Sequence, residues 1–262
     1  MTARPTPPHV LSLGAGVQSS AMALMASEGL LTPMPVAAVF ADTQDEPASV
    51  YRWLDWLQPR LAFPLWTVTK GRLSDGETQI RRSRTSGHLY RRGLIPAYLD
   101  GGAPSFRHCT QEFKLRPLFR AYRSLTKGPV VQWIGISTDE AHRMKDSLKP
   151  WLTNRYPLIE AGLTRQACRE WFFRRGYPQP PRSACRYCPY HSDAEWSRLK
   201  TEEPAEFQAA VDLEHRIQAA CDEVGQARVF LHRSLKPLDA VSFASDNTRD
   251  LFGNECEGMC GV

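Results

Sequence analysis

The chain has 262 residues, of which 42% are hydrophobic and 23% are charged, and its formal net charge is +5. This is the composition of an ordinary globular protein, long enough to bury a substantial core. The first eight residues are polar and rich in proline, and the apolar run 36–41 is too short to span a bilayer. We therefore expect a cytoplasmic protein that has no membrane partner.

Strand and helix patterns alternate over the first 70 residues. We expect strands over 9–13, 36–40 and 65–68, and helices over 19–28 and 47–57. This βαβαβ order predicts a parallel sheet with right-handed crossovers. The next segment, 71–105, is rich in arginine, glycine and proline. We expect it to be a long loop over the carboxyl edge of the sheet.

The remainder of the chain is predicted to be mainly helical. Periodicity indicates a fourth strand over 130–136 and helices over 112–125, 165–175, 193–200 and 204–224. The fold class is therefore α/β, with a doubly wound, mostly parallel sheet and a C-terminal extension that is helical and rich in cysteine. We place the α/β domain at 1–178 and the extension at 179–262.

A glycine-containing turn follows the first predicted strand. Its residues are Ser12, Leu13, Gly14, Ala15, Gly16, Val17, Gln18, Ser19 and Ser20. Free N–H groups at the start of a helix, together with serine hydroxyls, make a site for anions. The turn lacks the Gly-Lys-Ser/Thr ending of a Walker A loop and the third glycine of the dinucleotide fingerprint. On its own it fits an ordinary strand–helix turn equally well.

The second predicted strand ends in an acidic residue, with the sequence Phe40-Ala41-Asp42-Thr43. In doubly wound sheets the ligand binds at the carboxyl edge, where Asp42 is expected. Together with the glycine turn, this pattern resembles the PP-loop ATP-pyrophosphatase superfamily. That resemblance implies that the turn holds the phosphates of ATP or a sulfonucleotide, with Mg²⁺ as a further expected ligand. Gln18 stands where many members have aspartate, and sulfonucleotide reductases resemble this chain there.

Seven cysteines suggest metal or redox chemistry rather than a disulfide framework. The stretch from Cys109 to Leu118 resembles the Cys-Cys-x-x-Arg-Lys-x-x-Pro-Leu motif of the phosphoadenosine phosphosulfate (PAPS) reductase family that carries iron–sulfur clusters, with Lys114 in register. A C-x-x-C pair, Cys185 and Cys188, follows 76 residues later. The resemblance implies that Cys109, Cys185 and Cys188 hold a [4Fe–4S] cluster. Thr110 replaces the family's other cysteine.

The fourth metal ligand stays open. Three cysteines suit a cluster with one open iron, and Cys260 near the C-terminus could instead complete the set. Zinc is the main alternative, with His191, Cys256 or Cys260 as its fourth ligand. The resemblance to reductases, which end in a mobile Glu-Cys-Gly tail, implies that Cys256 is the nucleophile. Cys168 and Cys221, in contrast, are expected to fill the core.

The fourth predicted strand leads into a segment that resembles the family's Gly-x-Arg…Arg pattern. Gly135 is expected to bind nucleotide and Arg143 to pair with an anion. Ser137 stands where the reductases have an arginine, which weakens the match to a PAPS reductase.

The segment 81–92 is crowded with arginines. It contains Arg81, Arg82, Arg84, Arg91 and Arg92. Such a segment could bind nucleotide phosphates or an RNA backbone, and it fits a solvated basic loop equally well.

The combined reading is an enzyme that binds an adenine nucleotide beside a metal centre and carries out sulfur chemistry. It is either a sulfonucleotide reductase, regenerated by a thiol donor, or an ATP-dependent sulfurtransferase that takes sulfide. In the thiolation reaction the acceptor is a base of tRNA or another nucleobase. The rival from another class is a non-catalytic, zinc-containing protein that binds nucleic acid.

Overall fold

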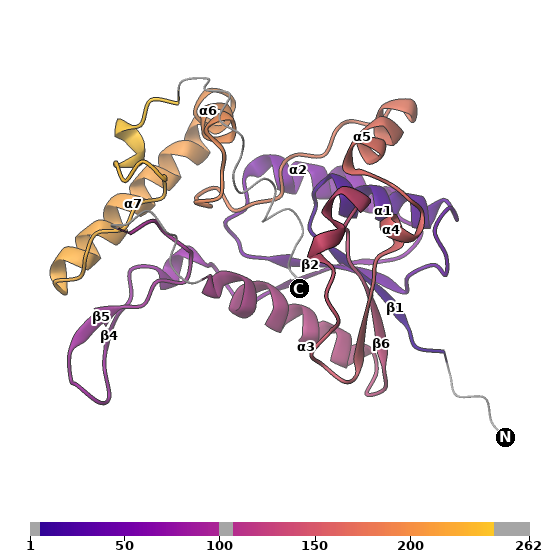
Figure 1. Cartoon of the computed structure of the whole chain (residues 1–262), viewed down its shortest axis with the longest axis horizontal. Coiled ribbons are helices and arrows are strands. Elements are labelled where there is room, and N and C mark those ends of the chain that lie inside the picture. Colours follow the sequence, from indigo (N-terminus) through magenta and orange to yellow (C-terminus); the bar gives the residue numbers. More distant parts are fainter. Residues whose placement is uncertain (1–5, 100–106, 244–262) are drawn as a thin grey trace.

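The computed structural model describes residues 6–99 and 107–243 (Figure 1). Its centre is a five-stranded sheet with the strand order β3-β2-β1-β6-β7, in which every neighbouring pair is parallel. The strands of this sheet are β1 (His9–Leu13), β2 (Ala37–Asp42), β3 (Leu65–Thr69), β6 (Val130–Trp133) and β7 (Leu152–Arg155). The order reverses between β1 and β6. This switch point lies beside the turn that the sequence predicts to hold phosphate.

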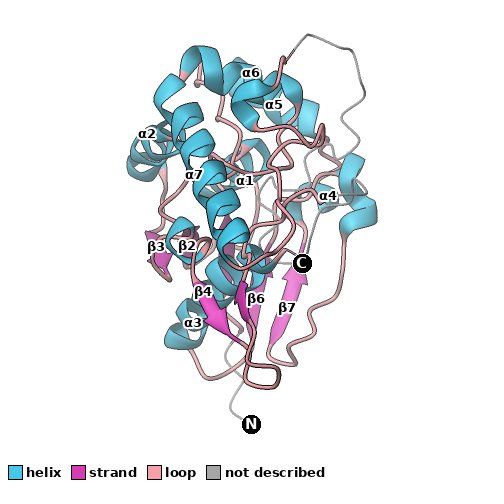
Figure 2. Ribbon diagram, turned by 90° about the vertical axis from the view of Figure 1, so that its left-hand side faces the viewer, coloured by secondary structure: helices cyan, strands magenta, loops and turns pink. Residues whose placement is uncertain are grey.

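Alternate residues of the strands face two separate cores. On one face Leu11, Leu13 and Phe40 pack against four helices. These helices are α1 (Val17–Ser27), α2 (Ala48–Leu57), α4 (Pro157–Glu160) and α5 (Arg165–Arg174). On the other face Val10 and Val39 pack against α3 (Arg116–Leu125). Figures 1 and 2 show the resulting three layers, in which helices cover both faces of the sheet.

A second body of structure lies beside the sheet. It contains the long helix α7 (Pro204–Glu223), helix α6 (Asp193–Glu202) and an antiparallel hairpin of β4 (Ile80–Arg82) and β5 (Leu89–Arg91). Figure 1 shows the hairpin extending away from the rest of the molecule. Short helical turns complete the fold at η1 (Gln58–Arg60), η2 (Ser74–Gly76), η3 (Thr110–Leu115), η4 (Thr138–Arg143) and η5 (Leu238–Ala240).

The predicted fold class is confirmed: the chain is an α/β protein with a parallel sheet and C-terminal helices. The hairpin and strand β7 were not predicted. The hairpin falls within 71–105, which was expected to be a loop, because its three-residue strands are too short and too rich in arginine to show a strand pattern. Strand β7, with the sequence Leu-Thr-Asn-Arg, has one buried residue, so it carries little hydrophobic signal.

The C-terminal helices share a core with residues from the middle of the chain. Trp196 and Leu213 lie in the same buried cluster as Leu73, Leu94 and Phe113. This cluster crosses the boundary expected at residue 178, which stays a prediction. Among residues 6–99 and 107–243, no helix has both the length and the apolar character required to cross a membrane.

Candidate functional site at the carboxyl edge of the sheet

The glycine turn is a tight and fully buried structure between β1 and α1. Ala15 has a positive φ of 62°, and Gly16 is the N-cap residue of α1. The Ser19 hydroxyl accepts a hydrogen bond from the Gly14 N–H at 3.2 Å and lies 3.4 Å from the Gly16 carbonyl oxygen. Ser20 accepts a hydrogen bond from the Trp53 indole at 2.9 Å, which joins α1 to α2. Buried Ser12 lies on β1, just before the turn.

Gln18 connects this turn to the segment that follows β6. Its side-chain amide donates to Glu140 Oε2 at 2.8 Å and to the Ser137 hydroxyl at 3.2 Å. Glu140 in turn accepts from Arg143 Nη1 at 2.6 Å. Gln18, Ser137 and Glu140 are all more than nine-tenths buried. Arg143 is therefore connected to the glycine turn through Glu140 and Gln18.

Gly135 allows the two loops to approach each other. A Cβ atom at this position would lie 2.9 Å from the backbone nitrogen of Ser19 and 3.0 Å from its Cα. Both are backbone atoms at the start of α1 and cannot move without shifting the turn. The absence of a side chain at residue 135 therefore sets the spacing between the loops after β1 and β6.

A Gly135→Ala variant should accordingly lower the free energy of unfolding by about 1–3 kcal/mol, the usual cost of overpacking. It should also weaken ATP binding, because the turn must move. Urea unfolding and calorimetric titration with ATP would measure the two effects. Gly128→Ala is the control, since its Cβ would meet only the Thr126 side chain, at 3.3 Å. Equal behaviour of the two variants would show that the spacing is unimportant.

Asp42, the acidic residue predicted at the end of β2, caps its own turn. Its Oδ1 accepts hydrogen bonds from the Gln44 N–H at 2.7 Å and from the Tyr51 hydroxyl at 2.9 Å. The residues that follow it contact the C-x-x-C segment instead. Thr43 Oγ1 lies 3.3 Å from Cys185 Sγ, and the Cys185 thiol donates to Glu46 Oε1 at 3.6 Å. Thr43 and Glu46 were not predicted as partners of Cys185, although the polar run from Asp42 to Glu46 follows the end of β2.

The C-x-x-C segment crosses the carboxyl ends of β1 and β2. A Cβ built on Gly16 would lie 3.5 Å from the Cβ of Ser183, while Cys185 contacts Thr43 two residues further along. Within the motif, the Cys188 N–H donates to the Cys185 carbonyl at 2.9 Å, which closes the turn. The segment thus joins the predicted phosphate site to the predicted metal site.

The two side chains between the cysteines fix this segment to the loop after β2 and to α7. The Arg186 guanidinium donates to the carbonyl oxygens of Asp45 and Glu46, and it forms an ion pair with Glu206 at 2.7 Å. The Tyr187 hydroxyl donates a short hydrogen bond to buried Asp45. The two residues between Cys185 and Cys188 therefore fix the position of the motif.

The three cysteines predicted to bind metal line one small, mostly apolar pocket. Cys109, Cys185 and Cys188 share it with Lys114 and Arg107. Burial raises the pKa of the Cys185 thiol well above its ordinary value, and the carboxylate of Glu46 adds to the shift. Lys114 opposes it; its Nζ lies 3.6 Å from Glu46 Oε1. A bound metal would reverse this shift, because coordination deprotonates a thiol.

Three thiols from two distant segments line this pocket beside a cationic side chain, and thiolates are the ligands that zinc and iron–sulfur clusters use. In the part of the chain that the structure describes, no three His, Cys, Asp or Glu side chains already surround a point that could hold a metal ion. Coordination would therefore require the side chains to move. His191, the alternative zinc ligand, has its Nε2 3.0 Å from the Cys185 carbonyl oxygen, and burial lowers its pKa to about 3.

The helix that carries Cys109 has an unusual winding. Residues Thr110–Leu115 form a π-helix, shown by the bond from the Arg116 N–H to the Gln111 carbonyl. Such segments are rare and occur frequently at functional sites. Here the π-helix buries Lys114 and Glu112. Glu112 forms ion pairs with Lys70, at 2.6 Å, and with Arg92.

Cys109 is also held through a buried carboxylate, Glu77. Glu77 Oε1 accepts from the N–H groups of Leu94 and Ile95 at 2.8 and 2.6 Å, and Arg91 Nη1 lies 3.2 Å from its Oε2. The Leu94 carbonyl then accepts from the Cys109 N–H at 2.8 Å. Glu77 therefore fixes a turn that forms one wall of the thiol pocket, a role that the sequence did not reveal.

Burial raises the pKa of Glu77 to about 7, although Arg91 and two N–H donors oppose the shift. The folded protein then binds a proton that the unfolded chain releases near pH 4.5, so stability falls as pH rises from about 4.5 to 7. Glutamine mimics the protonated form. We expect Glu77→Gln to match the wild type at pH 4.5 and to be more stable by about 2–3 kcal/mol at pH 8. Urea unfolding at both pH values checks this; a less stable variant at pH 8 would mean that the Arg91 ion pair outweighs burial.

The remaining cysteines fall into two groups. Cys168 and Cys221 are buried in helices α5 and α7, as expected of core residues. Cys256 and Cys260, the predicted nucleophile and fourth ligand, lie outside the described residues, so both assignments stay predictions.

No family model matches the chain, and no curated protein matches its sequence. Among solved structures, the fold is similar to that of phosphoadenylyl-sulfate (PAPS) reductase from Candida auris, determined as a phosphate complex. The TM-score is 0.41 and the sequence identity is 12%, over 68% of this chain and 76% of the other. Function must therefore be inferred from the chemistry of the site itself.

Proposed function

We propose that the protein is an enzyme of sulfur chemistry that binds an adenine nucleotide at the turn between β1 and α1. The observation that carries the proposal is the path of the C-x-x-C segment, which contacts both this turn and the end of β2. A phosphate-binding turn at a switch point and a pocket lined by three thiols are thereby brought to one edge of the sheet.

The nucleotide site consists of the N–H groups of the turn and the residues around it. Gly14, Gly16 and Ser19 offer a helix N-terminus to a phosphate. Arg143 lies next to them through Gln18 and Glu140, so its guanidinium can pair with a phosphate or sulfate group. The aspartate at the end of β2 and a magnesium ion are further expected parts of this site.

Cys109, Cys185 and Cys188 would hold the metal centre, for which a [4Fe–4S] cluster is the first candidate and zinc the second. Bound there, a cluster with an open iron supplies a site for sulfide or for a sulfur-containing substrate. The protein's own part is to bury the thiols, hold the pocket with Arg186 and Tyr187, and place Lys114 as a cation beside it.

Two reactions fit this arrangement. In the reductive one, the Cys256 thiolate attacks the sulfur of a sulfonucleotide and displaces the nucleotide phosphate; a dithiol donor then releases sulfite, becomes a disulfide and restores the cysteine. In the second, ATP adenylates an acceptor with release of pyrophosphate, and sulfide then displaces AMP. The test is to supply PAPS with a dithiol reductant, and separately ATP with sulfide and tRNA as the acceptor, to protein purified anaerobically. Release of sulfite would identify the first reaction, and formation of AMP and pyrophosphate would identify the second. If neither set of products formed, the proposal would be refuted.

A further inference from the structure

The β4–β5 hairpin is a rigid ribbon. Register pairs Arg81 with Tyr90 and Arg82 with Leu89. Its tip is closed by the bond from the Ser83 N–H to the His88 carbonyl at 2.8 Å, and by the Arg82 guanidinium, which donates to the Gly87 carbonyl at 3.0 Å. These bonds hold the arginine side chains on a preformed framework, so little conformational entropy would be lost on binding.

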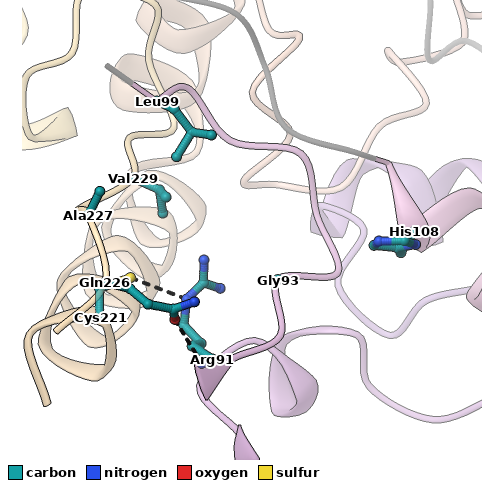
Figure 3. Close-up of a pocket in the computed structure, with 8 residues that line it drawn as sticks. All are labelled: Arg91, Gly93, Leu99, His108, Cys221, Gln226, Ala227 and Val229. Carbon is teal, nitrogen blue, oxygen red and sulfur yellow. Dashed lines mark hydrogen bonds between the residues drawn. The ribbon is translucent and has the colours of Figure 1, made fainter. Parts of the chain in front are cut away.

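The base of the hairpin is fastened to the body of the protein. Figure 3 shows two hydrogen bonds from Arg91. Its backbone N–H donates to Oε1 of Gln226, just after α7, at 2.8 Å, and its Nε donates to Sγ of Cys221, within α7, at 3.3 Å. Arg91 and Arg92 are also neutralised by Glu77 and Glu112. These two arginines serve the fold, and they keep the hairpin extended from the body, as Figure 1 shows.

The outer part of the hairpin has a different charge balance. Arg81, Arg82 and Arg84 are exposed, and none of them forms an ion pair with a described residue. The sequence from 78 to 93 contains no aspartate or glutamate at all. Tyr90 lies opposite Arg81 on the neighbouring strand, so an aromatic ring and a guanidinium share one face. Three exposed arginine side chains without a carboxylate partner among the described residues favour a polyanion as the binding partner.

We propose that this hairpin docks the phosphodiester backbone of a nucleic acid, whose base is the acceptor in the sulfur chemistry proposed above. A two-stranded ribbon can enter a groove of a nucleic acid, its exposed arginines can pair with phosphates, and the ring of Tyr90 offers a stacking surface for a base. A membrane surface fits less well, because Leu89 is the one large apolar residue exposed among 80–92.

The hairpin also leads directly to the candidate site. Three residues after β5, the chain enters the turn at Leu94 and Ile95 that holds Cys109 and lines the thiol pocket. A nucleic acid bound along the hairpin is therefore delivered to the side of the molecule where the three thiols meet. This step rests on the proposed function, whereas the docking itself does not.

The test compares an R81Q/R82Q/R84Q variant with an R52Q/R169Q/R174Q control, which removes three exposed arginines from α2 and α5. Binding of a labelled RNA stem-loop and of the DNA version of the same sequence is followed by fluorescence anisotropy as salt is raised. Loss of three phosphate contacts should weaken binding by about 10- to 100-fold and reduce the salt slope by about 2–3. The control should bind like the wild type, and the RNA and DNA arms identify the nucleic acid.

The proposal is overturned if the wild type binds neither nucleic acid, if both variants lose affinity equally, or if vesicles of anionic lipid or an acidic peptide compete more strongly than nucleic acid. Calorimetric titration with ATP on the same variants separates this proposal from the preceding one. If the wild type binds ATP but no nucleic acid, only the docking proposal is refuted. If it binds nucleic acid through the hairpin but no adenine nucleotide, the proposed enzyme function is refuted and the docking proposal stands.

Discussion

A Cys185→Ser variant purified without oxygen is expected to lose its bound iron and acid-labile sulfide, or its zinc, with metal affinity lowered at least about 100-fold. The Cys185 Sγ lies at the centre of the site, in contact with Thr43 and Glu46 and on the wall shared with Cys109 and Cys188. A serine hydroxyl is a poor ligand for either centre. Metal and sulfide analysis, with the visible absorbance spectrum, gives the readout.

Cys168→Ala is the matched control for that experiment. Cys168 is also a buried thiol, but it packs in α5 among Trp171 and Phe172 and is not among the residues that line the pocket of the three cysteines. Its loss should reduce stability by about 1–2 kcal/mol without altering metal content. If Cys185→Ser retained the full metal content of the wild type, the three-thiol centre would be refuted.

Gln18→Glu is expected to destabilise the protein strongly at pH 8 and much less at pH 5. The change places a carboxylate 2.8 Å from Glu140 Oε2, in a place where both side chains are more than nine-tenths buried. Two carboxylates at this distance cannot both remain ionised, and the pair recovers when it shares one proton at lower pH. The expected loss is about 3–5 kcal/mol at pH 8, with ATP binding lowered by at least about 10-fold.

The chain contains a close control for this charge effect. On the exposed surface of α5, Gln166 donates from its amide to Glu170 at 3.1 Å, the same pair of groups in water. Gln166→Glu should therefore change stability by less than about 0.5 kcal/mol at either pH. Urea unfolding at both pH values compares the two. Similar small effects in both variants would show that the Gln18–Glu140 contact does not organise the site.

Much of the fold could be predicted because its signals are local. The strands β1 and β2 are nearly uniformly buried, as central parallel strands are, and the glycine turn marks the step from strand to helix. The hairpin and β7 were missed because these strands are short and polar. The hairpin is held in place by tertiary contacts, such as that of Arg91 with Gln226.

The candidate site could be predicted only in part, for a similar reason. The C-x-x-C spacing singled out Cys185 and Cys188, and the resemblance to the iron–sulfur reductases added Cys109; all three line one pocket. Glu46, which accepts from the Cys185 thiol, was not predicted, because the chain turns after Asp42 and presents the later residues to the thiol. Long-range partners of this kind, including Glu77 with the turn at Leu94, leave no pattern in the sequence.

The π-helical winding between Cys109 and Lys114 has a consequence for how this region tolerates change. Five-residue hydrogen bonding brings residues that are five apart towards the same side of the helix, which ordinary α-helical winding would not do. The distance between thiol and ammonium group thus depends on one surplus residue in the turn. Rewinding the segment as a regular α-helix with every residue kept would turn Cys109 and Lys114 about 140° apart, whereas deleting one residue between them would return the pair to one face, four residues apart.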